Sequence, residues 1–344
     1  MNNDRIQEIL DLMEEARLDY FLISDPQSIA YCTGYYNNPH ERMFVFMISK
    51  HGNHTLFMND LFYLDHDLDV NIVWHKDGQD AIQTIVDEMH FPGRIGIDKN
   101  WASHFLLDLM KKLPDAKYIN ASPCVDLVRM KKDLQEQVLM IESSKINDAV
   151  MEEIISFIQE GVTEKQLAKK LDELFFNHHS TCYGAIVAFG KNAADPHHEN
   201  DDTPLRKGDC VLIDMGCVYK GYCSDMTRTF FYEGILEEEI KVYEIVKKAN
   251  EAAEAMIKPG VKLSDIDKCA RKVISDEGYG KYFTHRLGHF IGRDVHEYGD
   301  VSSVNEMEVE EGMIFSIEPG IYLEGNFGVR VEDLVMVTKD GCQV

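Results

Sequence analysis

The chain has 344 residues, of which 44% are hydrophobic and 28% charged, a balance typical of a folded globular protein rather than a disordered or fibrous one. Its 35 Lys and Arg against 60 Asp and Glu give a formal net charge of -25, which would repel phosphate backbones and anionic lipid surfaces. Nucleic acid and membranes are therefore not expected partners. The N-terminus lacks a continuous apolar signal region, and no later stretch approaches the roughly 18 apolar residues of a membrane span, so we expect a soluble, cytoplasmic protein.

The eight cysteines include no CxxC pair, and several lie in apolar runs. We interpret them as small buried side chains of a protein in a reducing compartment. Cys217 and Cys223 flank a turn and are the pair that would form first under the alternative of a disulfide framework.

Helical and strand patterns alternate in the first part of the chain. A helix is predicted over residues 6–16, and strands over 20–24, 43–48 and 94–98. Such alternation favours an α/β domain with a largely covered sheet. Because a single core seldom grows far beyond about 250 residues, a second domain is expected. The pattern changes after Pro123, so we place the two domains at residues 1–124 and 125–344.

The second part combines helices and strands in an α+β pattern. Amphipathic periodicity predicts one or two helices over 134–158, with Gly161 as the C-terminal glycine, and further helices over 163–176 and 264–278. Thr163 and Gln166 form a capping-box motif, and Ser264 with Asp267 is expected to open the last helix. Strand-like segments cover residues 185–189, 210–215, 226–232, 313–317 and 328–337.

Two aspartates lie at the ends of neighbouring strand-like segments. Asp214 follows the apolar residues 211–213, and Asp225 begins the next strand after a glycine-containing turn, so a hairpin could bring their carboxylates together. Acids embedded in strands cost free energy unless a positive charge compensates them. Each aspartate alone is equally well explained as a solvated turn or strand-end residue.

Three further residues have the side chains of metal ligands. Glu318 directly follows an apolar run, Glu332 lies within a β-branched run, and His289 lies in a Gly-His-Phe-Ile-Gly segment. Taken singly, Glu332 could face solvent and His289 could be a hydrogen-bonded core histidine. One histidine and four acids placed in or beside strands nevertheless form a set of metal ligands.

Charge balance favours two ions at this site. Four carboxylates within about 4 Å of one another would repel by roughly 4 kcal/mol per pair at an effective dielectric of 20, and two divalent cations cancel the four charges. Such a pair can hold a bridging hydroxide and polarise a scissile carbonyl. Oxygen-rich ligation with one imidazole suits Mn²⁺, with Co²⁺ and Zn²⁺ as alternatives.

The motifs around these residues carry a family resemblance. They read Ile-Asp-Met-Gly (213–216), Ser-Asp-Met-Thr-Arg-Thr (224–229), Gly-His-Phe-Ile-Gly (288–292), Asp-Val-His-Glu (294–297), Ser-Ile-Glu-Pro-Gly-Ile-Tyr (316–322) and Val-Arg-Val-Glu-Asp (329–333). In this order they resemble the metallopeptidase family that includes methionine aminopeptidase, aminopeptidase P and prolidase. The resemblance extends over essentially the whole chain.

The resemblance implies a creatinase-like α/β N-terminal domain followed by a pita-bread C-terminal catalytic domain, in a protein that forms a homodimer. It further implies that Asp214 binds one metal ion, that His289 and Glu318 bind the other, and that Asp225 and Glu332 bridge both. Glu318 would also serve as the proton shuttle for the bridging hydroxide.

Three other positions match the family motifs or adjoin them. By resemblance, His197 would support the tetrahedral oxyanion or the leaving group, and His296 would contact the substrate carbonyl. Arg330 precedes Glu332 by two residues, on the same strand face, and is a candidate to orient a substrate carboxylate. A solvated loop, a turn and a surface ion pair are the respective alternatives.

The sequence departs from the family pattern after the metal histidine. Phe290 replaces an inner glycine, a variant that we associate with prolidases, and Arg293 occupies a place that is commonly apolar. Arg293 could place a cation beside the pocket for the first residue of the substrate and favour acidic residues there. An ion pair within this acidic protein is the alternative.

Three functions fit this pattern: hydrolysis of Xaa-Pro dipeptides, an aminopeptidase P-like reaction on longer peptides, and a non-catalytic binding module on the same scaffold. All five ligands are present, which disfavours the inactive module. The two-domain length favours the dipeptidase, so the sequence predicts a metallopeptidase that hydrolyses Xaa-Pro dipeptides.

Overall fold

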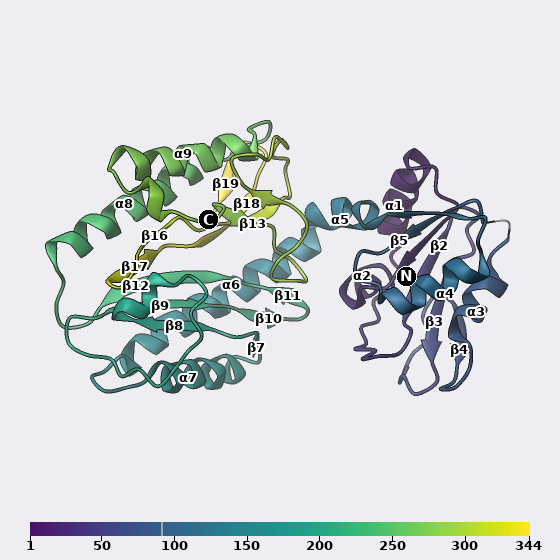
Figure 1. Cartoon of the computed structure of the whole chain (residues 1–344), viewed down its shortest axis with the longest axis horizontal. Helices are drawn as coiled ribbons and strands as arrows, with labels where there is room; N and C mark the ends of the chain where they lie inside the picture. Colours follow the sequence, from purple (N-terminus) through teal and green to yellow (C-terminus); the bar gives the residue numbers. More distant parts are fainter. Residues whose placement is uncertain (91) are drawn as a thin grey trace. The chain divides into compact units, whose positions relative to one another are not determined.

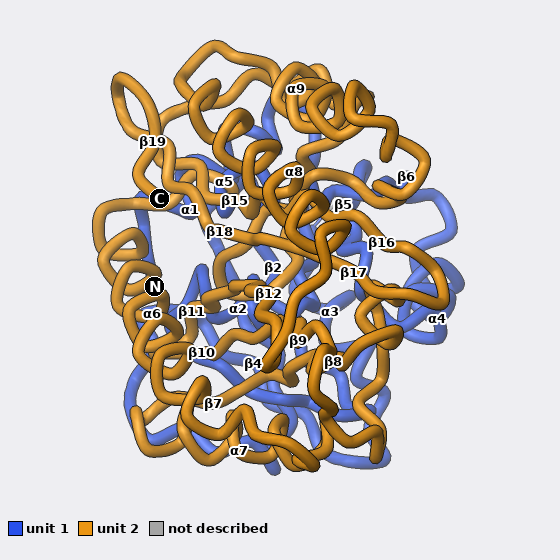
Figure 2. The backbone as a smooth tube through the Cα atoms, turned by 90° about the vertical axis from the view of Figure 1, so that its left-hand side faces the viewer, with its two compact units in different colours: residues 1–129 blue, residues 130–344 orange. Residues whose placement is uncertain are grey.

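The computed structural model describes residues 1–90 and 92–344, which divide into two compact units, Met1–Arg129 and Met130–Val344 (Figures 1 and 2). The domain boundary expected after residue 124 falls within helix α5 (Ser122–Met130).

Unit 1 is built on a six-stranded mixed sheet in the order β4-β3-β2-β1-β5-β6. Its strands are β1 (Tyr20–Ile23), β2 (Val45–Ser49), β3 (Thr55–Asn59), β4 (Asn71–His75), β5 (Arg94–Ile97) and β6 (Lys117–Asn120). Every residue of β1, β2 and β3 is buried, so both faces of the sheet are covered, and the apolar runs are continuous for that reason.

Helices cover the two faces of this sheet separately. On one face, α1 (Asn3–Glu15), α2 (Pro26–Thr33) and α5 pack against a cluster that includes Phe21 and Phe46. On the other face, α3 (Ala81–Glu88) and α4 (Ser103–Lys112) pack against a cluster that includes Leu22 and Phe57. The prediction of an α/β first domain with a covered sheet is confirmed.

The helices of unit 2 are α6 (Leu134–Ile154), α7 (Glu164–Asn177), α8 (Glu237–Glu254) and α9 (Leu263–Asp276), with the short 3-10 helices η1 (Ile155–Phe157), η2 (Gly190–Ala194) and η3 (Gly280–Tyr282). The predicted capping box is present. Thr163 Oγ1 accepts from Gln166 N at 3.2 Å, and Gln166 Oε1 accepts from Thr163 N at 3.0 Å. The prediction that Ser264 opens α9 is wrong. Its hydroxyl donates to Glu306 at 3.0 Å, and the N-cap is Lys262.

Unit 2 contains several small sheets. The one most relevant to the site has the order β12-β9-β8, and two others are β15-β18-β19 and β16-β17. Their strands are β8 (Ile186–Phe189), β9 (Cys210–Met215), β12 (Met226–Phe231), β15 (Ile314–Ile317), β16 (Gly320–Leu323), β17 (Phe327–Arg330), β18 (Asp333–Val337) and β19 (Cys342–Gln343). Shorter pairings join β13 (Gly288–His289) to β14 (Asp300–Val301), and β10 (Cys217–Tyr219) to β7 (Thr181–Cys182) and β11 (Tyr222–Cys223).

The single strand predicted over residues 328–337 is instead two strands, β17 and β18. Between them, Glu332 forms an isolated bridge with Thr227 of β12. The chain therefore passes from one sheet to another at the position of a predicted metal ligand.

Helices α6 and α7 pack against one face of the β12-β9-β8 sheet. The buried cluster there includes Val150 and Leu171 from the helices and Val211 and Ile213 from β9. Because side chains alternate along a strand, Asp214 lies on the opposite face of the sheet from Ile213. The helices thus fix the face on which the acidic residues lie.

Within the described residues, no helix combines the length and the apolar character needed to cross a lipid bilayer. All eight cysteines belong to the described part of the chain and are free thiols, five of them buried.

Candidate active site

Strand pairing brings the acidic residues together. Thr227 of β12 pairs with Asp214 of β9 on one side and bridges to Glu332 on the other. Its hydroxyl donates to Glu332 Oε2 at 2.7 Å, and this bond joins residues 105 positions apart in the sequence. Glu332 and Asp214 therefore flank the same strand, and Asp225 lies one residue before it.

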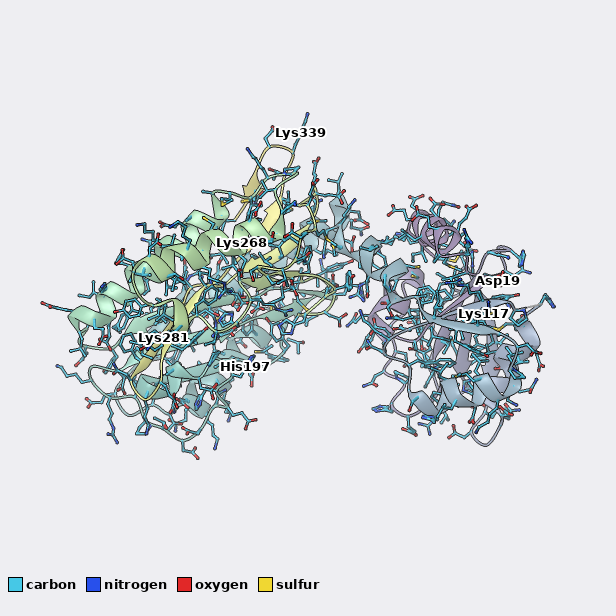
Figure 3. The ribbon with its side chains drawn as sticks, turned by 45° about the horizontal axis from the view of Figure 1, so that its top comes forward. Asp19, Lys117, His197, Lys268, Lys281 and Lys339 are labelled. Carbon is cyan, nitrogen blue, oxygen red and sulfur yellow. The ribbon has the colours of Figure 1, made fainter. Side chains whose placement is uncertain are left out.

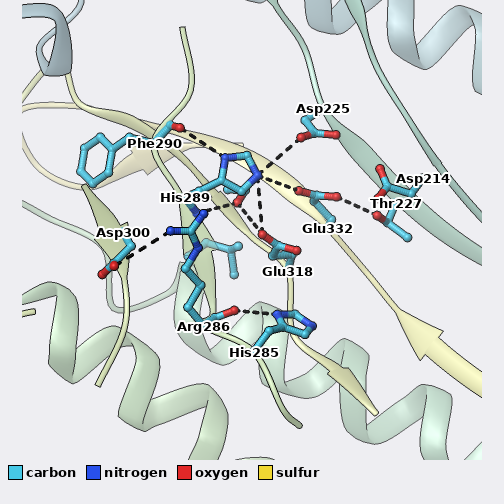
Figure 4. Close-up of polar contacts among 12 residues, drawn as sticks. Asp214, Asp225, Thr227, His285, Arg286, His289, Phe290, Asp300, Glu318 and Glu332 are labelled. Atoms are coloured by element: carbon cyan, nitrogen blue, oxygen red, sulfur yellow. Dashed lines mark hydrogen bonds and ion pairs between the residues drawn. The ribbon is translucent and has the colours of Figure 1, made fainter. Parts of the chain in front are cut away.

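Three carboxylates surround one imidazole nitrogen (Figure 4). His289 Nε2 lies 3.5 Å from Asp225 Oδ2, 3.6 Å from Glu318 Oε1 and 3.9 Å from Glu332 Oε1. These distances are longer than a good hydrogen bond but leave Nε2 and the carboxylates facing a common point. Donor atoms of Asp225, His289 and Glu332 all lie within 4.8 Å of one another.

The orientation of His289 is set by its backbone surroundings. Nδ1 lies 3.2 Å from the carbonyl oxygen of Phe290, to which an Nδ1–H would donate, and this contact directs Nε2 toward the acids. Ser316 links two of the candidate ligands, since its hydroxyl accepts from His289 N at 3.0 Å and donates to Glu318 Oε1 at 3.2 Å.

Arg330 holds the other side of the cluster. Its guanidinium, almost completely buried, donates from Nη2 to Asp214 Oδ2 at 2.7 Å, from Nε to Thr227 Oγ1 at 3.0 Å and from Nη1 to the Tyr322 hydroxyl at 3.0 Å. Arg330 thus binds Asp214 directly and supports Glu332 through Thr227. Whether it also meets a substrate carboxylate, as the sequence suggests, stays a prediction.

Burial makes this group of acids hard to ionise. It raises the pKa of Asp214 to about 6, although Arg330 counteracts the effect, and the pKa of Glu318 to about 7, against the pull of His289. Burial and the neighbouring Asp225 also raise the pKa of Glu332. For His289, burial lowers the pKa, but the neighbouring carboxylates of Asp225 and Glu318 outweigh it, and the pKa rises.

The residues present fit a pair of divalent cations. Four carboxylates and one imidazole converge, while Arg330 supplies a single compensating charge. Burial raises the pKa of Asp214 and Glu318, so ionising these carboxyls is favoured by a nearby cation, and oxygen-rich donor sets of this kind suit hard or borderline divalent ions. The five ligands predicted from the sequence all line one cavity.

That cavity has a volume of about 370 Å³ and brings together three histidines outside the ligand set. Besides the five candidate ligands, its lining comprises Tyr183, Gly184, Ile186, Pro196, His197, His285, Arg286, Val295, His296 and Arg330. The ring of His296 packs edge-on against His289, with 4.2 Å between the centroids. Burial lowers the pKa of His296 to about 4, so its imidazole is neutral at physiological pH.

His285 was not predicted from the sequence. Its Nδ1 lies 2.7 Å from the carbonyl oxygen of Arg286 and its Nε2 lies 2.8 Å from the Tyr322 hydroxyl, which in turn accepts from Arg330. A neutral ring with Nδ1–H satisfies all of these bonds, consistent with burial lowering its pKa to about 4. Its spacing of four residues before His289 was the only signal in the sequence.

The two arginines near His289 lie in different places. Arg286, not singled out from the sequence, lines the cavity, with Nη1 4.0 Å from Asp300 Oδ2 (Figure 4). Arg293, which the sequence did single out, lies elsewhere. Its guanidinium carbon is 5.4 Å from the centre of the Tyr222 ring, and its guanidinium lies beside Gly221. The cavity lining thus includes Arg286 and not Arg293 among the described residues.

Comparison with known proteins identifies the family. Residues 138–339 match metallopeptidase family M24, and residues 5–131 match the creatinase/prolidase N-terminal domain. The chain belongs to metallopeptidase family M24. This assignment confirms the predicted fold, a creatinase-like N-terminal domain followed by a pita-bread catalytic domain, and makes the protein a metal-dependent peptidase.

Solved structures of M24 peptidases resemble the chain over almost its full length. A dipeptidase from Pyrococcus horikoshii OT3 is 35% identical, with a TM-score of 0.91 over 98% of this chain and 96% of the other. The Xaa-Pro dipeptidase from Bacillus anthracis is 28% identical, with a TM-score of 0.92 over 99% and 96% of the chains. An X-Pro aminopeptidase from Thermotoga maritima is 29% identical, with a TM-score of 0.84 over 97% and 96%.

Proposed function

We propose that this M24 peptidase hydrolyses Xaa-Pro dipeptides, using two divalent metal ions held by Asp214, Asp225, His289, Glu318 and Glu332. The observation that carries the proposal is the convergence of three carboxylates on Nε2 of His289, inside a cavity that three further histidines and two arginines also line. When bound, the ions would activate a water molecule and polarise the scissile carbonyl.

Within this scheme Glu318 handles the proton. Ser316 donates to Glu318 Oε1 and holds that oxygen in place, so the carboxylate is positioned to accept a proton from water at the site and to return it. Glu318 Oε1 lies 3.6 Å from Nε2 of His289, which is also a proposed metal ligand. Glu318 is thus both a ligand and the group that takes the proton of the attacking water.

Two histidines at the cavity act as hydrogen-bond donors. The neutral ring of His296, packed against His289, can donate one N–H to the substrate carbonyl, and His197 can donate to the developing oxyanion or the leaving amine. A neutral His296 can make this donation, and burial disfavours its charged form by lowering its pKa.

The position of Arg286 favours a short substrate. A cation in the cavity can pair with the C-terminal carboxylate only if that carboxylate lies near the scissile bond, as it does in a dipeptide. In a longer peptide the same place is taken by an uncharged amide. This contrast supports the dipeptidase over an enzyme of the aminopeptidase P type.

The decisive experiment offers Leu-Pro and Leu-Pro-Pro to the purified protein with added Mn²⁺. We expect hydrolysis of Leu-Pro that a chelator abolishes. Cleavage of the tripeptide alone would establish the aminopeptidase reaction instead, the candidate favoured by the likeness to the Thermotoga maritima enzyme. Failure to cleave either peptide with Mn²⁺, Co²⁺ or Zn²⁺ would contradict both Xaa-Pro reactions.

Three further properties belong to the same proposal. Mn²⁺ is the expected metal because the donor set is mostly oxygen, with Co²⁺ and Zn²⁺ as alternatives. The free cysteines are consistent with a cytoplasmic protein. A homodimer is expected from the family resemblance, and light scattering on the purified protein measures it.

A further inference from the structure

One buried carboxylate makes several of the hydrogen bonds that anchor the loop carrying His197, and Asn200, which bonds to Val187 N and Ala185 O, anchors the same segment. Glu164, the first residue of α7, is completely inaccessible to solvent, although charged side chains are seldom buried without partners. Its partners all come from residues 189–201, the end of β8 and the segment that contains His197. Figure 3 labels His197 on the second unit.

Both oxygens of Glu164 are fully used. Oε1 accepts from Phe189 N and from Asn192 Nδ2, each at 2.9 Å. Oε2 accepts from His198 Nε2 at 2.6 Å and from Asp201 N at 3.0 Å. The carboxylate therefore joins the start, the middle and the end of the loop in one hydrogen-bonded group.

This saturation argues against a metal ion at the same place. Glu164, His198 and Asp201 offer donor atoms within 4.8 Å of one another, which could also describe a metal site. Four N–H donors already occupy the lone pairs of Glu164, however, and two of them are backbone amides that cannot move away without opening the loop. The cluster is a structural brace.

His197 occupies a tight turn that ends at the braced residue. His198 N donates to Asp195 O at 3.2 Å, which makes Pro196 and His197 the central residues of a β-turn. The side chain of Asp195 accepts from His197 N at 3.0 Å, as aspartate at the first position of a turn commonly does. Pro196 and His197 line the cavity, while His198 points to Glu164.

We propose that Glu164 and His198 position His197 at the cavity, and that the hydrogen bond between them is what holds the turn in register with the metal ligands. His197 is itself exposed and has only its backbone fixed locally, so the orientation of the turn must come from its anchored end. His198 and Glu164 are positioning residues. The catalytic consequence rests on the role proposed above for His197.

Paired substitutions at His198 test this inference. Glu164 is too deeply buried for a clean change, whereas the His198 side chain retains slight exposure. His198→Gln can still donate to Glu164, but His198→Leu cannot. For Leu-Pro with Mn²⁺, we expect His198→Leu to lower kcat on the order of tenfold with little change in KM, since small misplacement of a reacting group mainly lowers turnover. We expect His198→Gln to restore most of the rate.

A double-substitution cycle separates positioning from general damage. In a His197→Ala background, His198→Leu should cause no further loss of kcat, because the group that it positions is gone. An equal fold-loss with and without His197 would overturn the proposal, as would an equal loss for His198→Leu and His198→Gln.

A readout that needs no turnover keeps the test separate from the proposed function. With Zn²⁺ in place of paramagnetic Mn²⁺, the imidazole NMR signal of His197, assigned with His197→Ala, should shift in His198→Leu and not in His198→Gln. Deuterium uptake by residues 190–201 should rise in the same variant alone. If the wild-type protein fails to cleave Leu-Pro, the proposed function is refuted. Independently of that result, an unshifted His197 NMR signal and unchanged deuterium uptake in His198→Leu would refute the positioning role of Glu164 and His198.

Discussion

Nη2 of Arg330 lies 2.7 Å from Oδ2 of Asp214, and the same buried guanidinium also donates to Thr227 and Tyr322. One side chain thereby supplies three hydrogen bonds and a positive charge beside the proposed metal ligands. The charge of Arg330 lowers the pKa of Asp214, although burial outweighs it.

Replacing Arg330 by lysine tests this arrangement. A lysine ammonium cannot reproduce the planar fork that meets three acceptors at once. We expect Arg330→Lys to lower kcat/KM for Leu-Pro by roughly 100-fold, and to weaken Mn²⁺ binding measured by calorimetry, because Asp214 would hold its proton more tightly. Arg206→Lys, at an exposed position, is the control and should leave both unchanged. Wild-type binding and turnover in Arg330→Lys would contradict this role.

Stability of the metal-free protein should depend on pH. The pKa of Asp214 rises from 3.8 to about 6 and that of Glu318 from 4.5 to about 7. At these two carboxyls the folded protein retains protons that the unfolded chain has released between about pH 4 and 7, so their contribution to the free energy of unfolding falls as pH rises through this window. His285 and His296, whose pKa is lowered to about 4, contribute in the opposite direction. The contribution of Glu318 is isolated by comparing wild-type protein with Glu318→Gln, and we expect it to fall by about 3 kcal/mol between pH 4.5 and 7.5, measured by urea unfolding with a chelator present.

Metal should reverse that trend, because cations bind the ionised carboxylates and compete with protons. With saturating Mn²⁺, the free energy of unfolding should be higher at pH 7.5 than in the chelated protein at the same pH. Glu318→Gln should flatten the pH dependence of the metal-free form. The same pH dependence in chelated wild-type protein and in Glu318→Gln would show that Glu318 does not retain its proton in the folded state.

A buried ion pair next to His296 should be important for stability. Lys132 Nζ lies 3.0 Å from Glu297 Oε2, and both side chains are at most 5% exposed. Removing one partner of a buried ion pair is strongly destabilising, so we expect Lys132→Met to lower the free energy of unfolding by about 3 kcal/mol or more. Urea unfolding measures this loss.

The neighbouring lysine supplies the control. Lys131 pairs with Glu310, but both side chains are about half exposed, so Lys131→Met should cost less than about 1 kcal/mol. Adding Glu297→Leu to Lys132→Met should recover part of the stability by removing the buried carboxylate that has lost its lysine. Equal effects at positions 131 and 132 would refute the distinction.

Arg286 should distinguish substrates by their C-terminal charge. Arg286→Met is expected to raise KM for Leu-Pro roughly tenfold, the usual worth of a charge-assisted hydrogen bond, because the paired carboxylate loses its cation. KM for Leu-Pro amide, which has no carboxylate, should change little. Steady-state kinetics on the two substrates measures the difference, and the same rise for both would exclude carboxylate recognition.

Arg293 was predicted to favour acidic first residues, and this stays a prediction. Its guanidinium lies over the Tyr222 ring, so any influence on the pocket must act from there. If Arg293 attracts an acidic side chain, Arg293→Ser should lower kcat/KM for Asp-Pro relative to Leu-Pro by several-fold, since interactions between charges at a distance are partly screened. An unchanged ratio would remove Arg293 from the account of specificity.

Much of the site could be predicted from sequence because its signals are local. Asp214, Glu318 and Glu332 each lie in or directly after an apolar strand-like run, where a carboxylate is unexpected unless it is used. Strand alternation then determines the face of each side chain, which is why Asp214 and Ile213 lie on opposite faces of β9. The covered sheet of the first domain and the capping box at Thr163 follow from equally local patterns.

The sequence by itself determined the fold class, the family motifs and the identity of the candidate ligands. Tertiary structure alone decided how they meet. It brings Thr227 to Glu332 across 105 residues and interrupts the predicted strand between β17 and β18 at this point. It also places Arg286 at the cavity and Arg293 over the Tyr222 ring. Periodicity along a strand or helix reports only the face on which a side chain lies. Contacts between distant segments depend on sheet register and helix packing. These are set by the free energy of the whole unit, so a local sequence pattern does not reveal them.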